Sequence, residues 1–533
     1  MLSTQLLPFS VAATDPAALA RQRSILEEHA RKPLLERAAE LARSAAIRPA
    51  RGGAAAEAIE VSAKARGLSA GAQLSAARLR DPRAVAVITG QQPGFLGGPL
   101  YCILKAVHCV RFAQALEKTL GVPVVPLYWL HTDDHDIDEV RGIGLFAGRK
   151  PPVHVSVDLG RGRPFLSDVR LPASAAELWL QIQGHVPAGP DREKAIQWLK
   201  PEPGDRLADA TIRLLDGLFG EHGLVPFEPQ DLRTVLSLEL ADVIEALPST
   251  LPQFQQMAAS VRLEGLRGPF DLQDPPIVFQ RTVRGRERVH IELSRALLPS
   301  GEGITYQELA TRVRTQPELF SAGVASRVLV EALALPVAAS IRGPGELAYS
   351  PFCKPLMPRQ RSRPLPIEVP RWTATLVPQE IADLCTSIGL EPASLVDPAA
   401  AAPAASERAK LREELEIQQI SADLRARLAA LRDPLIAADG ALARSVDKTL
   451  ASTGRSMERL SRKVTEALDR KLDLAYIRWN RARAVLRPFG APQERSIGAL
   501  QFLPSGRTAF VNRLMETCDL VPTGHRLIPI PSL

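Results

Sequence analysis

The sequence has few cysteines, and their spacing fits neither a disulfide-rich nor a zinc-binding protein. The five are Cys102, Cys109, Cys353, Cys385 and Cys518, with no CxxC pair among them. This spacing excludes a disulfide framework and a zinc-finger site. We expect buried thiols in a reducing compartment.

Long apolar runs are also absent. No stretch of about 18 apolar residues occurs, and the first residues lack the basic start and apolar stretch of a secretory signal. We therefore expect a cytoplasmic protein with no membrane partner.

Neither sign of charge dominates the chain. Lys and Arg number 66 against 59 Asp and Glu, and the net charge of +7 is spread over 533 residues. We expect no nucleic-acid partner, although a basic binding face stays an alternative. Apolar residues make up 45% and charged residues 23%, which indicates a folded globular protein. This length predicts two or three domains.

The beginning of the chain has the pattern of helices followed by a strand-helix-strand unit. Residues 16–80 have apolar positions at helical spacing, and residues 84–89 are a short apolar run that ends in a glycine-rich stretch. Residues 99–121 then have the apolar stripe of a helix, and residues 122–130 form a second strand candidate. The unit predicts a parallel sheet whose ligands lie at the carboxyl ends of the strands.

Changes in composition and in the hydrophobic pattern divide the part of the chain before the helical region into three segments. Residues 1–149 contain the N-terminal helices and the first part of the core. Residues 150–300 mix short strand-like and helical pieces, which is typical of a connecting insertion. In residues 301–396 a helix leads into a strand again, so the core sheet is expected to resume there.

A strongly helical region follows a low-complexity stretch at residues 397–405. Within residues 397–490, apolar residues step by threes and fours on both sides of a glycine turn. This predicts an antiparallel coiled-coil hairpin whose second arm, if continuous to Leu486, is roughly 65 to 70 Å long. Residues 491–533 are expected to return to the core.

A glycine-rich loop follows the first predicted strand. Its candidate ligand-binding residues are Gly90, Gln91, Gln92, Gly97 and Gly98. Glycines let backbone amides approach a ligand, and the helix that follows favours an anion at its N-terminus. The loop is neither a GxGxxG nor a Walker motif. A purely structural turn is the alternative, but adjacent glutamines are unusual in turns.

A second polar cluster, at residues 129–139, follows the second strand. Within it, His135 flanked by Asp134 and Asp136 is suited to bind an amine or to remove its proton. Trp129 and His131 would line the same crevice. A metal site is an alternative, although HExxH is missing, and so is a plain acidic loop. We expect no metal.

A third cluster again places glycines after a strand. Gly343 and Gly345 precede Glu346 and Tyr349, whose side chains can bond hydroxyls or an amine. Further along, Lys354 and Arg371 are candidates to neutralise carboxylates or phosphates.

Taken in order, these motifs resemble those of the cysteine-adding enzymes of bacillithiol synthesis. The resemblance is carried by TGQQPGFLGGPLYCILKA, which includes Tyr101, by VPLYWLHTDDHDIDEV, and by GPGELAY followed by Lys354 and Arg371. The C-terminal Gln493-Glu494-Arg495 fits the same pattern, and the resemblance runs from about Leu7 to Pro531.

The resemblance implies an α/β fold: a Rossmann-like parallel-sheet core with connecting insertions, related to nucleotidylyltransferases and class I aminoacyl-tRNA synthetases. It also implies a C-terminal coiled-coil domain that supports a homodimer. The implied reaction forms an amide between the carboxyl of L-cysteine and the amine of glucosaminyl-malate, in the synthesis of a low-molecular-weight thiol.

An amide requires an activated carboxyl, and ATP is the economical hypothesis, although no HIGH or KMSKS motif is present. On this hypothesis the loop at residues 90–98 holds the activated acyl group or its phosphate. His135, Asp134 and Asp136 bind and deprotonate the amine, and the loop at residues 343–349 completes the pocket.

The chain departs from the family pattern at three positions. Glu331 and Ala332 stand where the family often has Gln and Asp, and Phe352 stands where Gln is expected. A ligase for another amine is therefore an alternative. So is a coiled-coil scaffold with a degenerate Rossmann-like core.

Overall fold

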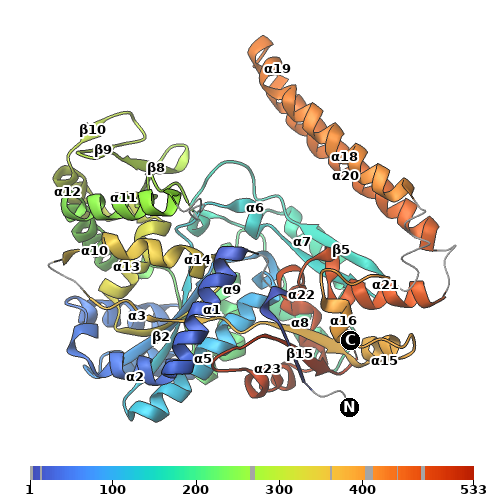
Figure 1. Ribbon diagram of the computed structural model, residues 1–533, viewed down its shortest axis with the longest axis horizontal. Helices are drawn as coiled ribbons and strands as arrows, with labels where there is room; N and C mark the ends of the chain where they lie inside the picture. Colours follow the sequence, from blue (N-terminus) through green and yellow to red (C-terminus); the bar gives the residue numbers. More distant parts are fainter. Residues whose placement is uncertain are drawn as a thin grey trace. The chain divides into compact units, whose positions relative to one another are not determined.

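The structure is a computed structural model that describes residues 4–11, 15–263, 270–359, 363–402, 412–440, 442–469 and 474–532. The chain forms two compact units (Figure 1). Residues 1–379 and 487–533 make up the first unit, and residues 380–486 make up the second.

The first unit is built on a five-stranded parallel sheet in the order β13-β12-β2-β3-β6. Its strands are β2 (Val85–Gln91), β3 (Val124–Leu130), β6 (Val225–Phe227), β12 (Val337–Arg342) and β13 (Ile367–Pro370). Nearly every residue of the three central strands is buried, which explains why these segments are continuously apolar.

The order of the strands reverses between β2 and β12. From β2 the chain adds β3 and then β6 on one side, and it later returns to add β12 and β13 on the other. This is the order of a Rossmann fold, in which the crevice at the reversal point receives ligands beyond the carboxyl ends of the strands. The predicted Rossmann-like parallel core is therefore confirmed.

Helices cover this sheet. The predicted N-terminal helical segment contains α1 (Pro16–Arg31), α2 (Leu34–Arg43), α3 (Gly52–Ala65) and α4 (Ala70–Arg78). Of these, α2 contacts β12 and β13, and α4 contacts β3 and β6. The predicted helix between the first two core strands is α5 (Leu100–Leu120), which packs against both of them.

The stretch between β3 and β6 forms a first connecting region. It contains α6 (Ile137–Val140), the antiparallel hairpin β4 (Gly142–Ala147) and β5 (Lys150–Ser156), and then α7 (Ser174–Gln183), α8 (Arg192–Leu199) and α9 (Leu207–Phe219). Because β6 follows at residues 225–227, the segment expected to form the insertion also contributes one strand to the core sheet.

The stretch between β6 and β12 forms a second lobe of the first unit (Figure 1). Its helices are α10 (Arg233–Glu245), α11 (Leu247–Leu263), α12 (Tyr306–Thr315) and α13 (Val324–Ala334). Its antiparallel sheet has the order β10-β9-β8-β7-β11, with β7 (Val278–Thr282), β8 (Gly285–Ile291), β9 (Ala296–Leu297), β10 (Gly303–Ile304) and β11 (Phe320–Ala322). The polypeptide then re-enters the core through β12 and α14 (Pro344–Cys353).

The C-terminal segment joins the first unit through a separate three-stranded sheet. There β15 (His525–Ile530) lies between β1 (Gln5–Leu7) and β14 (Ala374–Pro378), antiparallel to β1 and parallel to β14. Before β15 come α22 (Gln493–Ser496) and α23 (Arg507–Thr517), both of which pack against α5.

The second unit contains the predicted helical hairpin. It comprises α15 (Gln379–Thr386), α16 (Pro392–Val396), α18 (Arg412–Ala430), α19 (Arg432–Ala438), α20 (Leu442–Asp469) and α21 (Leu474–Leu486). Ion pairs between Arg425 and Glu458 and between Arg432 and Asp447 show that α18–α19 and α20 run antiparallel. Residues 403–405 of the low-complexity stretch and the following residues 406–411 lie outside the described residues. So do residues 470–473, which decide whether the second arm is continuous.

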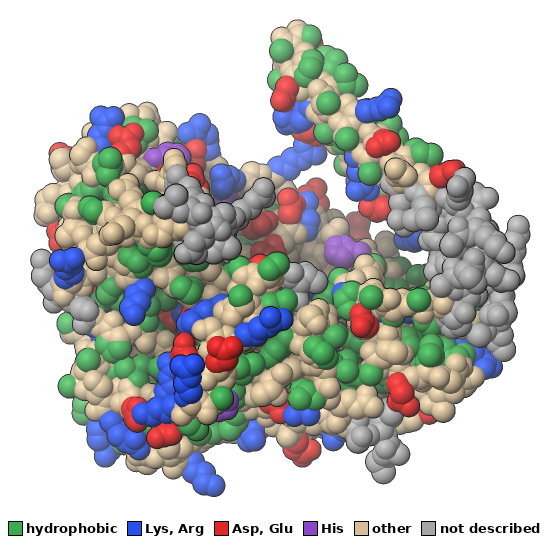
Figure 2. All heavy atoms as spheres, viewed as in Figure 1, with side chains coloured by type: hydrophobic (Ala, Val, Ile, Leu, Met, Phe, Trp, Pro, Cys, Tyr) green, Lys and Arg blue, Asp and Glu red, His purple; other side chains and the backbone are tan. Residues whose placement is uncertain are grey.

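Apolar side chains remain exposed along this hairpin (Figure 2). They include Ile420, Leu431 and Leu460, each about half exposed.

No helix among the described residues is both long and apolar enough to cross a bilayer.

Gly97 gives a test of the loop that follows β2. Its φ of +82° is a conformation that other residues adopt only with strain, and a Cβ placed there would lie 2.0 Å from Leu214 Cδ2. We predict that Gly97→Ala lowers the free energy of unfolding by about 1 to 3 kcal/mol, measured by urea denaturation. Gly53→Ala is the control, because nothing lies within 4 Å and helix α3 accepts alanine. Equal stability of the two variants would contradict this account.

Candidate functional site

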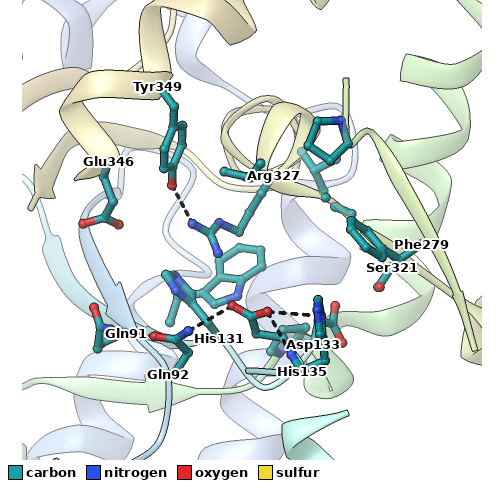
Figure 3. A pocket seen from close by; sticks show the side chains of 18 of the residues that line it. Gln91, Gln92, His131, Asp133, His135, Phe279, Ser321, Arg327, Glu346 and Tyr349 are labelled. Atoms are coloured by element: carbon teal, nitrogen blue, oxygen red, sulfur yellow. Dashed lines mark hydrogen bonds and ion pairs between the residues drawn. The ribbon is translucent and has the colours of Figure 1, made fainter. Parts of the chain in front are cut away.

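A cavity of about 570 Å³ lies at the carboxyl ends of the parallel strands (Figure 3). Its walls come from the loops after β2, β3, β12 and β13, from α13, and from the β7, β8 and β11 strands of the second lobe. Twelve of the predicted site residues line it: Gln91, Gln92, Tyr101, Trp129, His131, Asp134, His135, Gly343, Gly345, Glu346, Tyr349 and Arg371.

The two glutamines after β2 connect this loop to the acidic cluster. Gln91 Nε2 donates to Gln92 Oε1 at 2.7 Å. Gln92 Nε2 then donates to Asp134 Oδ2 at 3.0 Å and to Glu139 Oε2 at 2.9 Å. Burial raises the pKa of Glu139, and Asp136 and Asp134 add to the rise although the bond from Gln92 opposes it. The cavity therefore has an acidic side built around Gln92.

Lys105 lies beneath the loop, on α5, with only 2% of its side chain exposed. Its ammonium donates to the carbonyl of Gly90 at 2.6 Å, to Gln91 Oε1 at 3.2 Å and to Glu346 Oε2 at 2.7 Å. Burial lowers the pKa of Lys105, whereas the Glu346 carboxylate works to raise it. The only signal for this residue in the sequence is a cation inside an apolar helical stripe, a pattern that by itself matches no known motif.

Backbone bonds hold the loop after β3. The amide of Ser167 donates to the carbonyl of Thr132 at 2.9 Å, and that of Leu166 donates to the carbonyl of Asp134 at 2.8 Å. Neighbouring Asp133 forms an ion pair with Arg233 of α10 and accepts from Gln230. The charge of Asp133 is therefore already neutralised.

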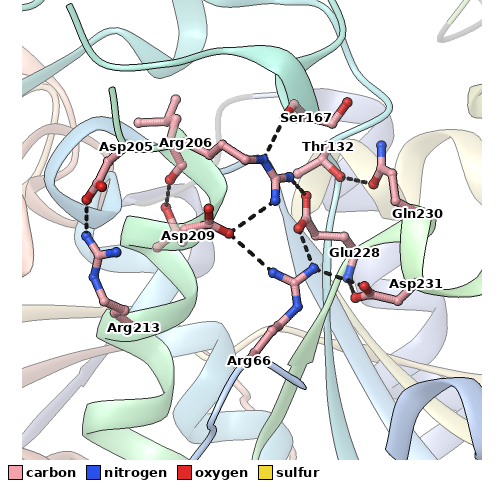
Figure 4. A network of polar contacts seen from close by, with 12 residues as sticks. Arg66, Thr132, Ser167, Asp205, Arg206, Asp209, Arg213, Glu228, Gln230 and Asp231 are labelled. Carbon is pink, nitrogen blue, oxygen red and sulfur yellow. Dashed lines mark hydrogen bonds and ion pairs between the residues drawn. The ribbon is translucent and has the colours of Figure 1, made fainter. Parts of the chain in front are cut away.

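A buried network of ion pairs supports the same loop (Figure 4). Glu228, which follows β6 and is fully buried, accepts from both Arg66 and Arg206 at 2.6 Å. Arg206 also donates to the carbonyl of Ser167 at 2.9 Å, and Ser167 is bonded to Thr132 as described above. The network thus connects α3 and α9 to the pocket loop, and its members are fixed scaffold rather than ligand contacts.

His135 is contacted by two guanidinium groups. Arg163 Nη2 lies 2.6 Å from Nε2, and Arg286 Nη1 lies 3.2 Å from Nδ1, with Asp134 Oδ1 3.5 Å from Nδ1. Burial, followed by the charges of Arg286 and Arg163, lowers the pKa of His135 to about 4. The arrangement suits a neutral imidazole that carries its proton on Nδ1 and accepts from Arg163. In this state it is a weak base.

The third cluster is organised by Glu346. Its Oε2 accepts from the amide of Gly343 at 2.7 Å and from Lys105, so it caps the N-terminus of α14. Burial tends to raise the pKa of Glu346, but Lys105 and Arg342 outweigh burial, and the pKa is lowered. Tyr349, one turn along α14, accepts from Arg327 Nη2 at 2.6 Å. The Arg327 side chain extends from α13 into the cavity beside Tyr349 (Figure 3).

Arg371 is anchored by the C-terminal segment. It forms a buried ion pair with Glu494 of α22, and its guanidinium lies 5.3 Å from the centre of the Tyr101 ring. The neighbouring Arg495 also lines the cavity over Tyr101. Arg495, from the C-terminal segment, thus lies over Tyr101 of α5 and completes this wall of the cavity.

Five predicted site residues do not line the cavity. Gly90 supports it through its carbonyl, and its lack of a Cβ leaves room for His131 Nε2. Gly97 and Gly98 have φ values of +82° and +72°, so their backbone shapes the loop. Asp136 caps α6, and Lys354 is exposed after α14.

The departures from the family pattern also lie outside the cavity lining. Glu331 is buried on α13 and pairs with Arg342 at 3.2 Å, while Ala332 is buried next to it. Phe352 is half-buried on α14.

Sequence reasoning missed the residues that the second lobe contributes. Arg286 on β8 is buried, stacks over the Phe279 ring at 3.8 Å, and donates to the Ser321 hydroxyl at 3.2 Å. These residues lie on short strands with no motif, and only tertiary packing brings them to the pocket. No group of three or more His, Cys, Asp or Glu residues suited to a metal occurs in the described parts of the chain.

The fold and the pocket define a Rossmann-like α/β protein with a polar small-molecule site at its strand ends and a helical hairpin as a second unit. Family comparison matches residues 36–372 to the N-terminal Rossmann-like domain of bacillithiol biosynthesis BshC proteins, and residues 374–530 to their C-terminal coiled-coil domain. The chain belongs to this family.

Individual relatives agree with this assignment. The chain is 26% identical to a protein named "Putative cysteine ligase BshC" from Salinibacter ruber, over 85% of this chain and 84% of the relative. Proteins of the same name from Geobacillus kaustophilus and Koribacter versatilis are each 28% identical, over 82% and 84% of this chain and 83% and 84% of their own lengths. The chain is a ligase-type enzyme of this family.

Buried histidines predict a stability that depends on pH. Burial lowers the pKa of His108, His135 and His525 from 6.5 to about 4, and it also lowers that of His131 well below 6.5. Between these values only the unfolded chain takes up protons, so the free energy of unfolding should fall as the pH drops from 6.5 towards 4.

Urea denaturation at several pH values between 4 and 7 measures the slope of the free energy of unfolding against pH. Replacing His135 by Asn should reduce the slope by up to about 1.4 kcal/mol per pH unit, the contribution of one proton. His222→Asn is the control, because that side chain is exposed. An unchanged slope in the His135 variant would contradict the buried, neutral state of this imidazole.

Proposed function

We propose that this chain joins L-cysteine, through its carboxyl, to the amine of glucosaminyl-malate, after ATP-dependent activation of the carboxyl in the cytoplasm. The observation that carries the proposal is the polar cavity at the carboxyl edge of the Rossmann-like sheet, in a chain that the bacillithiol family models match over almost its full length. The names of the relatives support cysteine as one substrate.

The size and charge of the cavity support this reaction. Its volume of about 570 Å³ is in the range of small-molecule sites. Six Lys or Arg residues and four Asp or Glu residues line it, and this mixture suits substrates that carry both ammonium and carboxylate groups. Glu331, Ala332 and Phe352, which differ from the family pattern, do not line the cavity. This favours the family's acceptor over another amine.

The chemistry sets two requirements on the site. A free carboxylate is a poor acceptor of an amine, and ATP supplies the leaving group that turns it into an acyl donor. The attacking amine must also lose its proton, and that proton needs a base nearby. Asp134 and Glu139, both bonded by Gln92, are placed to bind the ammonium and to accept the proton. The raised pKa of Glu139 supports this role.

His135 takes a narrower role in this proposal than the sequence suggested. Its Nε2 accepts from Arg163 and its lowered pKa makes it a weak base, so we assign it to orient Asp134 through Nδ1 and Arg163 through Nε2. Asp136 caps the N-terminus of α6 and so orients that helix. We place the activated acyl group beside Gln91 and Gln92, which line the cavity.

The exposed apolar residues of the hairpin support a further part of the proposal. Ile420, Leu431 and Leu460 leave apolar surface on helices that otherwise carry charged side chains. Apolar positions at coiled-coil spacing favour helix pairing, so we propose a homodimer formed through the second unit.

Purified protein with ATP, L-cysteine and glucosaminyl-malate tests the reaction, with mass spectrometry of the product. We expect the amide to form, and Gln92→Ala or Asp134→Asn to lower kcat/KM about a hundredfold, because each disrupts the acidic side of the site. Asp138→Asn is the matched control, since its side chain is 87% exposed on the same segment.

Three outcomes would count against the proposal. They are no amide from the wild-type protein, full activity of both pocket variants, or an equal loss in the Asp138 control. A panel of other amines in the same assay tests the alternative acceptor, and a clear preference for one of them would replace glucosaminyl-malate.

A further inference from the structure

One wall of the cavity carries positive charge that the described residues do not neutralise. Arg327 has no carboxylate within 4.0 Å among the described residues, and its one side-chain partner is the hydroxyl of Tyr349. Arg286, buried on the same wall, lies 3.6 Å from Asp134 Oδ1. The excess charge therefore collects where α13 meets the antiparallel sheet of the second lobe.

The other buried cations of the cavity have their own carboxylates. Lys105 pairs with Glu346 at 2.7 Å, while Arg233 pairs with Asp133 and Arg371 pairs with Glu494. These three pairs are internal and offer little free charge to a ligand. Arg286 and Arg327 differ from them, because Asp134 lies 3.6 Å from Arg286 and is bonded to Gln92 as well, and Arg327 has no carboxylate within 4.0 Å among the described residues.

The charge of Arg327 makes the charged form of Arg286 less favourable. Burial lowers the pKa of Arg286 to about 10, and the charges of Arg327 and Arg163 add to this effect against the opposing carboxylates. Like charges brought together in a buried site are unfavourable unless an anion joins them. An anionic group of a ligand would relieve this repulsion.

Hydroxyl groups beside the arginines can donate to the same ligand. Tyr349 accepts from Arg327, so its own proton is available, and burial raises its pKa to about 12, which keeps the proton in place. Ser321 accepts from Arg286 Nε at 3.2 Å and likewise retains a proton to donate. Both side chains line the cavity, and Figure 3 shows the Tyr349 hydroxyl beside the Arg327 guanidinium.

A helix N-terminus lies at the same place. Gly323 and Val324, at the beginning of the 11-residue helix α13, line the cavity. The N-termini of the other two helices at the strand ends are closed. The amide of Leu100, at the start of α5, donates to the carbonyl of Ile497 at 2.8 Å, and Glu346 caps α14. At α13 the amides of Gly323 and Ala325 likewise donate to carbonyls, those of Ile277 and Pro276, so this helix contributes its dipole rather than a set of free amides.

We propose that Arg286, Arg327, Ser321 and Tyr349, at the N-terminal end of α13, form a binding site for an anionic group of a substrate, a carboxylate or a phosphate. The source of the anion rests on the proposed function, in which glucosaminyl-malate supplies two carboxylates and ATP supplies phosphates. The acidic side of the cavity, around Gln92 and Glu139, is left to the ammonium group.

Isothermal titration calorimetry with L-malate, inorganic phosphate and ATP tests this site without turnover. We expect the wild-type protein to bind at least one of them, and Arg327→Gln to weaken that binding about ten- to a hundredfold through loss of a charged hydrogen bond. Arg327→Lys should recover part of the affinity. Arg284→Gln, which removes the same charge from the exposed β7–β8 turn, should bind like the wild type.

The pattern of binding identifies the source of the anion. Arg327-dependent binding of L-malate alone assigns the site to carboxylates, and Arg327-dependent binding of phosphate or ATP assigns it to phosphates. Tyr349→Phe removes one hydroxyl and no charge, and it should weaken binding about three- to tenfold, which keeps the site testable if Arg327→Gln does not fold. The proposal is overturned if the wild type binds none of the three probes, or if neither Arg327→Gln nor Tyr349→Phe weakens binding.

Failure of this site can be distinguished from failure of the proposed reaction. Arg327-dependent binding by a protein that makes no amide would leave the anion site standing and refute the reaction. Amide formation by Arg327→Gln with unchanged KM for glucosaminyl-malate and ATP would refute the site and leave the reaction standing.

Discussion

The buried ammonium group of Lys105 is the contact on which the arrangement of the pocket depends. It joins the carbonyl of Gly90, at the end of β2, to the carboxylate of Glu346, at the start of α14, across the point where the strand order reverses. Because an unpaired charge away from water is costly, these two loops cannot separate without a large penalty. Glu346 also binds the amide of Gly343, so the base of the pocket is one connected polar unit.

The sequence predicted those parts of the site that follow directly from strand order. Gln92 and His135 come just after continuous apolar strands, and parallel strands bring such loops to one edge of the sheet. Lys105 was missed because a cation in an apolar helix has no motif. Arg286 reaches the pocket through the packing of short antiparallel strands, which local spacing does not reveal. Lys354 follows a helix rather than a strand, and the structure leaves it exposed.

Charge within the pocket is unevenly distributed, and Asp134, 3.6 Å from Arg286, lies where the acidic side meets the basic wall. One side has Asp134 and Glu139 bonded by Gln92, and the wall at α13 has Arg286 and Arg327. Ion pairs hold the other buried cations, Lys105, Arg233 and Arg371, in place, and the Glu228 network supports the loop after β3. A substrate with an ammonium group and an anionic group fits this pattern in one orientation. The proposed acceptor, an amino sugar joined to malate, has both.

The central claim is that this pocket adds cysteine to glucosaminyl-malate. The most direct test is to measure low-molecular-weight thiols and their precursors in a strain of the source organism that lacks this chain. The account predicts that glucosaminyl-malate accumulates and bacillithiol is lost. An unchanged thiol pool, with no accumulation of glucosaminyl-malate, would contradict it.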